Sequence, residues 1–447
     1  MRSRDGEGAA VIRNIGWSLL TLLVAAAFVA FVAIVPWWGG ALAAALLAAW
    51  LALTRVGRQA WSVTEVGMST VPQRLGAASV VVVGIAGVVG VLVALFAMAE
   101  GFQSTLLETG NTDTAIVLRG GSQAELNSGL AHDATVIISN EPQVKRDSEG
   151  RPIASPELVV IASLPKKSSG TDANVELRGV GEGAWALRPN VHIIAGRRFT
   201  PGLRELIVGK RAAMEFEHTA LGSRFNLGGQ PWTVVGEFDS GDEHDSELWG
   251  DADVIAAAYR RGDSRNSVTV RLQSPKAFDA FKAALASDPR FKADASTTRD
   301  YYNRQSELLT RAIRVLGTAV AIIMAIGAIF GALNTMYAAV AARTREIATL
   351  RAMGFRGGPV VVSVLIETLL LALAGGVIGG AIAWALFDHY TASTLGSNFS
   401  QVVFEFRVTP ALLANGLKWA LAIGFVGGLF PALRAARMPV TDGLREQ

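Results

Sequence analysis

The chain has 447 residues, of which 51% are hydrophobic and only 18% are charged. Soluble chains carry about 25% charged residues, and the mean hydropathy here is +0.35. The composition therefore indicates an integral membrane protein with a large soluble part. A net charge of +3 is too small to indicate nucleic acid as a partner. Because the chain has no cysteine, disulfides, thiolate zinc sites and cysteine nucleophiles are excluded.

Six apolar runs predict membrane-spanning helices, since a helix needs roughly 20 apolar residues to cross the hydrocarbon core. The runs are 15–35, 37–53, 76–99, 312–341, 359–387 and 411–430. We predict that the first two form a helical hairpin turned at residues 36–40. A re-entrant hairpin is one alternative. A secretory signal is another for the first run, although its apolar stretch is longer than is usual for one.

Arginine placement predicts the orientation of these helices. The arginines gather on one set of connections: Arg2, Arg4 and Arg13 before the first run, Arg55, Arg58 and Arg74 between the second and third, Arg343, Arg345, Arg351 and Arg356 between the fourth and fifth, and Arg434, Arg437 and Arg445 after the sixth. The short connections on the other side contain one lysine or arginine, Arg407. Because basic connections stay in the cytoplasm, we expect both termini to be cytoplasmic and the long segment 100–305 to lie outside.

The segment 101–305 has the pattern of a folded α+β domain. Strands are predicted at 114–118, 134–139, 158–162, 175–180, 206–208, 224–227, 232–238 and 268–272. A helix is predicted at 277–286 with Ser274 as its N-cap. The stretches 140–156 and 239–253 are predicted to be loops.

The second of these loops is strongly acidic. It contains Asp239, Asp242, Glu243, His244, Asp245 and Glu247. These carboxylates lack the spacing of an EF-hand, and a single histidine among acids is a poor indication of zinc, so no metal ligand is predicted. We expect a solvated loop, with a partner-binding loop as the alternative.

The fourth apolar run ends in a short basic helix. Charged residues interrupt the run from Arg343 onwards, while Ile347, Leu350 and Met353 keep apolar residues at helical spacing. A basic helix between two membrane spans is expected at the cytoplasmic membrane surface. It is either a docking helix for a soluble partner, with apolar anchors and a charged rim, or a solvated connection whose arginines set the topology and touch anionic lipid.

The fifth run carries one carboxylate and two pairs of small residues. A charge at the depth of Glu367 costs about 2.5–3.5 kcal/mol. This residue is therefore expected either to link helices or to reach headgroups or a neighbouring arginine near the inner interface. Gly375 with Gly379, and Gly376 with Gly380, allow close helix packing, within the chain or between the chains of a dimer.

Several segments, in their order and spacing, resemble the permeases of the MacB/FtsX type, which are membrane subunits of ATP-binding-cassette (ABC) machines. The segments are NTM at 334–336, RTREIATLRAMG at 343–354, Glu367 followed by GGVIGG at 375–380, PALRAARMPVTDGLR at 431–445 and, in the outer segment, AGRRF at 195–199, ELIVGKRAA at 205–213 and WTVVGEF at 232–238. The resemblance covers roughly residues 76–446. It implies a membrane α-helical bundle with a four-span core and an α+β extracytoplasmic domain, to which residues 1–60 add two extra N-terminal spans.

The implied organisation follows the chain. It consists of an N-terminal hairpin at 1–60, a linker and first core span at 61–100, the extracytoplasmic domain at 101–305, the second core span at 306–341, the contact helix at 342–358, and the third and fourth core spans with a cytoplasmic tail at 359–447.

The resemblance also implies roles for individual residues. Contact with the ATPase falls to Arg343, Arg345, Glu346, Ile347, Leu350, Arg351 and Gly354, and coupling or packing in the membrane to Asn334, Glu367, Gly375, Gly376, Gly379 and Gly380. No catalytic residue is expected, because the nearest approach to a phosphate-binding loop, at 202–210, has the wrong spacing and is followed by Arg211 instead of serine or threonine. ATP and magnesium would then be bound by a separate ABC ATPase dimer.

The implied function is mechanical. The ATPase would move the permease helices, with 307–341 as the lever, so that the extracytoplasmic domain changes shape and a substrate is exported or extracted from the periplasm or membrane. The alternatives are a mechanotransmitter that switches a periplasmic partner such as a cell-wall hydrolase, and a membrane-anchored sensor. The implied setting is the bacterial inner membrane and its lipids, with a second permease chain, identical or different, and a periplasmic adaptor as partners.

Overall fold

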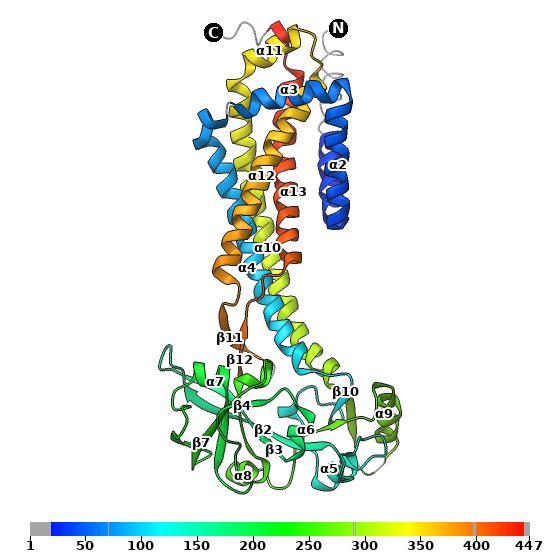
Figure 1. Cartoon of the computed structure of the whole chain (residues 1–447), viewed down its shortest axis with the longest axis vertical. Coiled ribbons are helices and arrows are strands. Elements are labelled where there is room, and N and C mark those ends of the chain that lie inside the picture. The colour runs from blue at the N-terminus through cyan, green and yellow to red at the C-terminus, as the bar shows by residue number, and fades with distance from the viewer. Residues whose placement is uncertain (1–18, 70, 289, 291, 397–398, 442–447) are drawn as a thin grey trace, which may run out of the picture. The chain divides into compact units, whose positions relative to one another are not determined.

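The computed structural model describes residues 19–69, 71–288, 290, 292–396 and 399–441 (Figure 1). The chain divides into two compact units. The helical unit comprises Met1–Ala97, Ile313–Asp388 and Arg407–Gln447, and the sheet unit comprises Met98–Ala312 and His389–Phe406. Arg2, Arg4, Arg13, Arg445, the start of the first apolar run and the end of the C-terminal motif lie outside the described residues.

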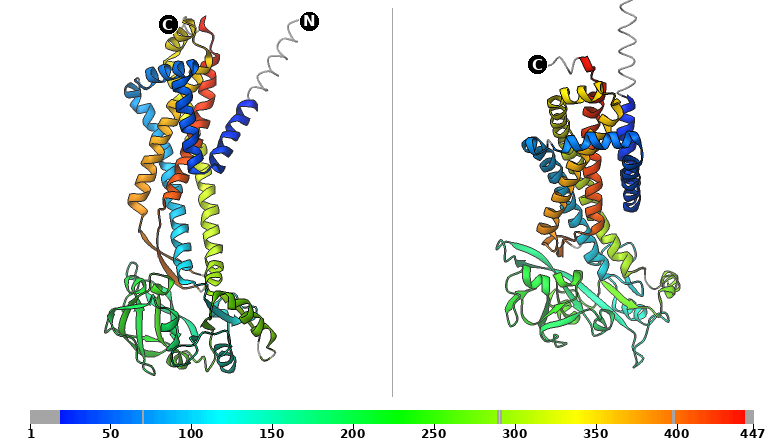
Figure 2. Two further views of the ribbon diagram at one scale, coloured as in Figure 1. Left: turned by 45° about the vertical axis from the view of Figure 1, so that its right-hand side comes forward. Right: turned by 45° about the horizontal axis from the view of Figure 1, so that its top comes forward.

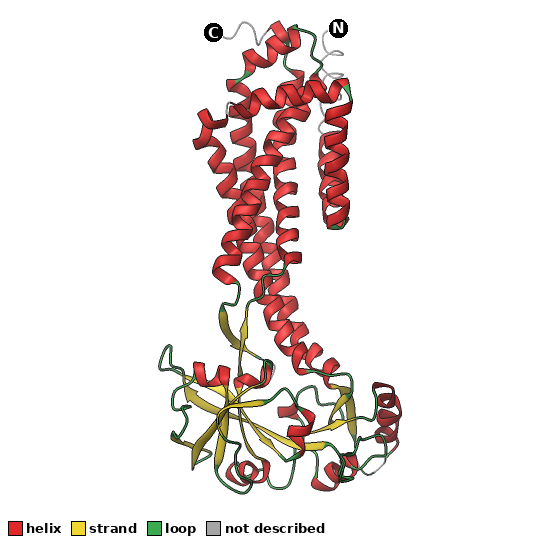
Figure 3. Ribbon diagram, in the orientation of Figure 1, coloured by secondary structure: helices red, strands yellow, loops and turns green. Residues whose placement is uncertain are grey.

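Four helices of the described chain are long and apolar enough to cross a membrane, which confirms the predicted four-span core (Figure 3). They are α4 (Leu75–Thr109), α10 (Thr298–Ala342), α12 (Gly357–Phe387) and α13 (Pro410–Arg437). The start of α13 is fixed locally, because the Thr409 side chain accepts a hydrogen bond from the Leu412 backbone N–H at 3.3 Å and Pro410 occupies the first turn.

The two additional N-terminal spans are not confirmed. The helix Leu19–Ile34 is short, and α2 (Trp37–Leu53) has 17 residues. The two form a hairpin (Figure 2). However, α2 is long and apolar enough to cross a membrane only together with α3 (Arg55–Ser69), and the two helices are bent by 98° relative to each other. The Thr54 hydroxyl makes this bend, because it donates to the Trp50 carbonyl at 2.9 Å and accepts from the Gly57 N–H at 2.8 Å.

Beyond the bend, α3 packs on α12 through a face of small side chains. Gly57, Ala60, Val63, Thr64 and Gly67 are its buried residues, and they recur at helical spacing. The 3₁₀ turn η1 (Val71–Arg74) then leads into α4.

The sheet unit is built on a mixed ten-stranded sheet, which confirms the α+β class. Its strands are β1 (Thr114–Arg119), β2 (Ala154–Pro165), β3 (Asp172–Val180), β4 (His192–Gly196), β5 (Glu205–Gly209), β6 (Arg224–Leu227), β7 (Gln230–Asp239), β8 (Glu247–Asp251), β9 (Ser267–Arg271) and β10 (Ala293–Thr297). Their order is β10-β1-β9-β2-β3-β8-β5-β7-β4, and β6 also pairs with β7. The pairs β3–β8 and β5–β7 are parallel, and the remaining pairs are antiparallel.

Short helices connect these strands. They are η2 (Glu125–Asn127), α5 (His132–Ser139), α6 (Gly183–Leu187), α7 (Lys210–Glu215), η3 (Glu243–Ser246), α8 (Ala252–Ala258), η4 (Pro275–Ala277) and α9 (Phe278–Ser287). A separate hairpin, β11 (Thr391–Leu395) with β12 (Gln401–Glu405), also belongs to the sheet unit. It is held there because the Val403 N–H donates to the Ser246 hydroxyl at 3.0 Å and the Lys166 ammonium donates to the Ser393 hydroxyl at 3.1 Å.

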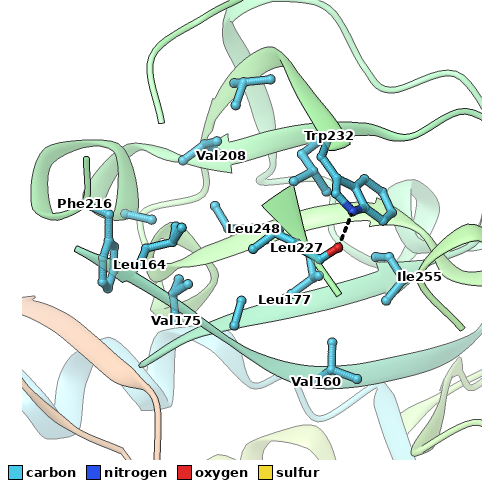
Figure 4. Close-up of a cluster of buried hydrophobic side chains, with 14 of the residues drawn as sticks. Val160, Leu164, Val175, Leu177, Val208, Phe216, Leu227, Trp232, Leu248 and Ile255 are labelled. Carbon is cyan, nitrogen blue, oxygen red and sulfur yellow. Dashed lines mark hydrogen bonds between the residues drawn. The ribbon is translucent and has the colours of Figure 1, made fainter. Parts of the chain in front are cut away.

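The strand β2 changes partner half-way along. Its residues Ala154–Glu157 pair with β9, and Leu158–Pro165 pair with β3. Each side has its own apolar core: one gathers around Phe281 and Leu285, and the other around Phe216 and Trp232 (Figure 4). The Trp232 indole N–H donates to the Leu227 carbonyl at 3.1 Å, so its polar atom is satisfied inside the core.

Three local predictions were wrong. Residues 134–139 form part of the helix α5, where Ala134, Thr135, Ile138 and Ser139 are buried at helical spacing, so tertiary packing overrides their β-branched composition. Residues 239–253 include η3, β8 and the start of α8 and are no loop. Ser274 precedes η4 but makes no side-chain capping hydrogen bond.

Candidate functional site

The basic helix predicted after the fourth apolar run is α11 (Thr344–Ala352), which follows α10 after a break at Arg343. Its buried residues are Thr344, Ile347 and Ala348. Ile347 belongs to an apolar cluster with Met336, Val340, Val360, Val364, Ala432 and Ala435, which come from α10, α12 and α13. The inner face of α11 is therefore used to attach it to its own helical unit.

The opposite face of α11 is open. Arg345, Glu346 and Thr349 are exposed, and Leu350 is half-buried. Met353, just after the helix, is 65% exposed. The guanidinium of Arg351 is half-buried and donates to the Met438 carbonyl, which ties α11 to the end of α13. One face thus presents a cation, a carboxylate, a hydroxyl and a thioether together.

Gly354 ends α11. Its φ is +99°, a conformation that glycine adopts at little cost. The Gly354 N–H donates to the Arg351 carbonyl at 3.1 Å, and the Phe355 N–H donates to the Leu350 carbonyl at 3.2 Å. This pair of bonds is a Schellman motif, which satisfies the last carbonyls of the helix and turns the chain towards α12.

Glu367 lies at the centre of a buried ion cluster behind α11. It is 3% exposed, and its two carboxylate oxygens accept from different arginines: Oε1 from Arg74 at 2.9 Å and Oε2 from Arg343 at 3.2 Å. Arg343 also donates to Glu346 at 3.2 Å. The cluster therefore joins α12, the end of η1 just before α4, and the junction of α10 with α11.

A fourth segment closes over this cluster. A Cβ added to Gly67, on α3, would lie 2.9 Å from Nη1 of Arg343 and 3.3 Å from Oε2 of Glu367. A side chain at this position would therefore require the Arg343 guanidinium to shift. Figure 1 labels α3 and α11 at the same end of the helical unit.

The glycine pairs of α12 face two neighbours of the same chain. Added Cβ atoms at Gly375 and Gly379 would meet the backbone carbonyls of Val82 and Ala86 on α4, at 2.7 and 2.3 Å. At Gly376 and Gly380 they would meet side chains of Ala420 and Leu413 on α13, at 2.8 and 3.3 Å. Asn334 is exposed on α10, and its side chain makes no hydrogen bond to any described residue.

Sequence reasoning missed two participants in the cluster. Arg74 was used only to predict topology, and Gly67 was not singled out. The sequence feature at Arg74 is a basic residue just before an apolar span, and the feature at Gly67 is a row of small residues at helical spacing. Neither pattern names a partner, because Arg74 and Glu367 lie in different helices far apart in the chain.

The sheet unit contains a second buried cluster with the opposite arrangement. Arg178, on β3, is 2% exposed. Its guanidinium donates to four carboxylates: Glu176 at 2.6 Å, Glu247 at 2.8 Å, Glu157 at 2.9 Å and Glu125 at 3.1 Å. It lies where β2 changes partner, since Glu157 is the last residue that pairs with β9.

A second arginine extends this cluster into the acidic stretch. Arg188 donates to Glu157 at 2.6 Å and to His244 at 3.1 Å, and His244 contacts Asp242 at 3.0 Å. The prediction of a solvated loop was wrong, because Asp242, His244, Asp245 and Glu247 are at most 3% exposed. Within the described residues no group of histidine or acidic side chains is arranged to hold a metal.

The surroundings of these carboxyls shift their proton affinities in opposite directions. Burial alone raises the pKa of Glu157, but Arg188 and Arg178 outweigh it and lower the pKa to about 2. For Glu243, burial and then the Glu176 and Glu247 carboxylates raise the pKa well above its ordinary value. A cavity of about 360 Å³ adjoins the cluster and is lined by Arg178, Arg188, His244 and Tyr302 among others.

A four-span helical unit that carries a mixed-sheet domain in the sequence between its first two spans defines a class of membrane permeases. Two family models match this chain: the MacB-like periplasmic core domain at residues 78–288, and the FtsX-like permease C-terminal region at residues 318–440. The chain belongs to the MacB/FtsX-type ABC permeases. It is a membrane protein with a periplasmic domain.

Individual relatives are distant. The chain is 24% identical over 401 residues to the macrolide export ATP-binding/permease protein MacB of Neisseria gonorrhoeae. The matched region covers 82% of this chain and 57% of the MacB protein. It is 24% identical over 388 residues to the uncharacterized ABC transporter permease YknZ of Bacillus subtilis, covering 80% of this chain and 92% of the relative. The chain thus spans little more than half the length of the MacB protein.

A solved structure of the periplasmic region of MacB from Actinobacillus actinomycetemcomitans is also similar. It is 14% identical and covers 43% of this chain and 91% of the solved one, with a TM-score of 0.33.

Proposed function

We propose that this chain is the membrane subunit of an ABC transporter in which ATP hydrolysis by a separate ATPase dimer moves the periplasmic domain, for export or for extraction of a substrate from the periplasm or membrane. The observation that carries the proposal is the two-sided packing of α11. Ile347 and the ion cluster of Glu367 attach the helix from within, while Arg345, Glu346 and Met353 are exposed. A firmly held helix with one open, charged face is suited to receive force from a soluble partner.

The expected contact residues divide into three roles under this proposal. Arg345 and Glu346, with Thr349 and Met353, touch the ATPase, and the half-buried Leu350 and Arg351 lie at the edge of the contact. Arg343 and Ile347 are positioning residues, because their side chains are buried in the helical unit. Gly354 sets the length of the helix.

Transmission would run along α10. This helix is continuous from Thr298 to Ala342, immediately before the break at Arg343, and it contributes residues to both units. Movement of α11 would be passed to α10 through the cluster of Arg343 and Glu367. Coupling of this kind requires that the ATPase bind the permease differently in two states.

The remaining partners and the location follow from the family. We propose that α11 and both termini face the cytoplasm of a bacterial inner membrane, that ATP and magnesium are bound by the ATPase, and that a second permease chain pairs with this one. A periplasmic adaptor would act with the sheet unit. The name of the Neisseria relative, a macrolide export protein, favours export over a switch that transports nothing.

Charge reversal on the exposed face of α11 tests the contact. The double variant Arg345→Glu with Glu346→Lys should lose co-purification of an ABC ATPase from native membranes, because it inverts the charge pattern while leaving Ile347 in place. The matched control is Arg55→Glu, an exposed arginine on α3, which should keep the ATPase bound. Undiminished ATPase recovery with the double variant would overturn the proposal and leave a membrane-anchored sensor as the better interpretation.

A further inference from the structure

A groove in the helical unit lies between the N-terminal helix Leu19–Ile34 and the core helices α4, α10 and α13. Its volume is about 310 Å³, within the range of small-molecule sites, which is about 300–1000 Å³. Val29 and Val32 form one wall, and Phe96, Ile329, Ala422 and Val426 are among the residues that form the others. These walls are apolar, and the polar side chains of the groove are Asn415 and Lys418.

Packing of the N-terminal helix on α13 creates this groove. Thr21 and Ala25 are buried, and the ring of Phe28 stacks on Phe425 with centroids 3.7 Å apart and planes 15° apart. These three residues recur at helical spacing, so one face of the helix is held against the core. The next residues towards Pro36 then line the groove.

Lys418 is an unusual residue for this position. It is half-buried on a membrane-crossing helix, yet its side-chain ammonium makes no hydrogen bond and no ion pair with any residue in the described part of the chain. A half-buried ammonium at the edge of an apolar groove offers an anion site and a hydrocarbon site side by side. This combination suits a ligand that joins an anion to a hydrocarbon chain.

The depth of Lys418 indicates where that anion lies. At 1.5 Å per residue, Lys418 is about 24 Å along α13 from Arg434, and Phe96 is about 33 Å along α4 from Arg74. Ala325, a further lining residue, is about 27 Å along α10 from Arg343. The hydrocarbon core is about 30 Å thick, so Lys418 lies near the interface opposite the arginine-rich end. Trp419, also in the lining, suits an interface of this kind.

We propose that this groove binds an anionic phospholipid from the leaflet opposite the arginine-rich end. The phosphate lies on Lys418, with Asn415 one turn away as a second donor, and an acyl chain lies along Val32, Ile329 and Val426. The bound lipid then fills the space between the N-terminal helix and the core. This gives the N-terminal helix a role as one wall of a lipid site, independent of any contact made by α11.

Native mass spectrometry of the detergent-purified full chain tests the proposal, with phosphatidylglycerol and phosphatidylcholine as the probes. Phosphatidylglycerol should be retained in preference to phosphatidylcholine. Lys418→Gln should lower phosphatidylglycerol retention about fivefold, the usual contribution of one basic side chain near an anionic lipid. Lys418→Arg should keep it, because the charge stays in place.

A second variant fills the groove without changing charge. Val426→Trp should lower retention of both lipids, whereas Ile323→Trp, at a position on α10 that is 70% exposed and outside the groove lining, should have no effect. Unchanged phosphatidylglycerol retention in both Lys418→Gln and Val426→Trp would overturn the proposal. So would a loss on Val426→Trp with the headgroup preference intact in Lys418→Gln, because the groove would then hold only a hydrocarbon chain.

Discussion

The two buried ion clusters of this protein are built in opposite ways. In the helical unit one carboxylate, Glu367, lies between two arginines. In the sheet unit one guanidinium, that of Arg178, lies among four carboxylates. A carboxylate has two oxygens, so Glu367 can serve one arginine with each, whereas a guanidinium has five N–H donors and can serve several acceptors.

The difference concerns protons as well as geometry. The Glu367 cluster contains two cations and two anions when Glu346 is counted, so its charges balance. Around Arg178 the carboxylates outnumber the cations even with Arg188 included. Burial, and then the negative charge of the neighbouring Glu176 and Glu247 carboxylates, raises the pKa of Glu243 well above its ordinary value. We expect the helical cluster to act as a fixed clamp and the sheet cluster to respond to pH.

The largest expected effect is the loss of the central guanidinium. Arg178→Met leaves four buried carboxylates without their common partner and should destabilise the sheet unit by about 3–5 kcal/mol or more, the cost of breaking a buried pair from one side. Hydrogen exchange of the full chain should then rise throughout β3 and β8. Arg197→Met, which breaks the exposed pair with Glu205, is the matched control and should change little. Similar exchange in both variants would contradict a central role for Arg178.

A slightly smaller effect is expected at the helical clamp. Glu367→Gln keeps the shape of the side chain but leaves the charges of Arg74 and Arg343 buried together, at a cost of about 3 kcal/mol. Amide exchange should accelerate in α11 and the end of α10, and coupled ATPase activity should fall while ATPase binding persists.

Glu346→Gln is the control for the clamp, because it changes the exposed partner of the same Arg343. Its exchange should match that of the wild type. If Glu367→Gln left α11 as protected as Glu346→Gln does, the clamp would not hold the helix.

The sequence predicted these two clusters unequally. Run length and charge identified the four core spans and the basic helix, but Gly354 was assigned to the ATPase contact and its role in ending that helix was not predicted. Helical spacing gives α11 an apolar and a charged face, but it does not say that the long side chain of Arg343 turns inwards to Glu367. The ion-pair partner of a charged side chain depends on which helices become neighbours in the fold. The spacing of residues in a single sequence does not show which helices those are.

The acidic stretch shows the same limit more strongly. The stretch contains Asp242, His244 and Glu247, which are residue types typical of a solvated loop. Their cationic partners, Arg178 and Arg188, lie far upstream in the sequence. Burial became predictable only once β3 and β8 were paired. The hairpin of β11 and β12 was missed for a related reason, since a short connection between two apolar runs gives no sign of the unit to which it belongs.

A moderate effect is expected at Glu243. Its raised pKa means that the folded protein binds this proton more tightly than the unfolded chain does, so its contribution to stability is complete below about pH 4.3 and is lost as pH rises towards the folded pKa. Glu243→Gln removes this pH-dependent loss of stability, because glutamine stays neutral at every pH. The variant should melt higher than the wild type at pH 8 and equally at pH 4, with about 2–4 °C gained for each kcal/mol.

Glu157 supplies the opposite control. Its pKa of about 2 means that stability is present above about pH 4.3 and is lost as pH falls towards 2. Glu157→Gln should therefore lower the melting temperature at pH 8, where Glu243→Gln raises it. Parallel melting curves for the two variants would show that the cluster does not divide its protons in this way.

The smallest expected effect is at the end of α11, and it separates the length of the helix from its attachment. Gly354→Ala forces a Cβ into the left-handed conformation at φ +99° and should cost about 1–2 kcal/mol locally. Exchange should rise in residues 350–355, while Ile347 and the start of the helix stay protected. Gly358→Ala, where an added Cβ meets open space, should leave exchange unchanged. ATPase binding should weaken only if the contact extends to Met353, so the pair of variants also locates the far edge of the proposed contact.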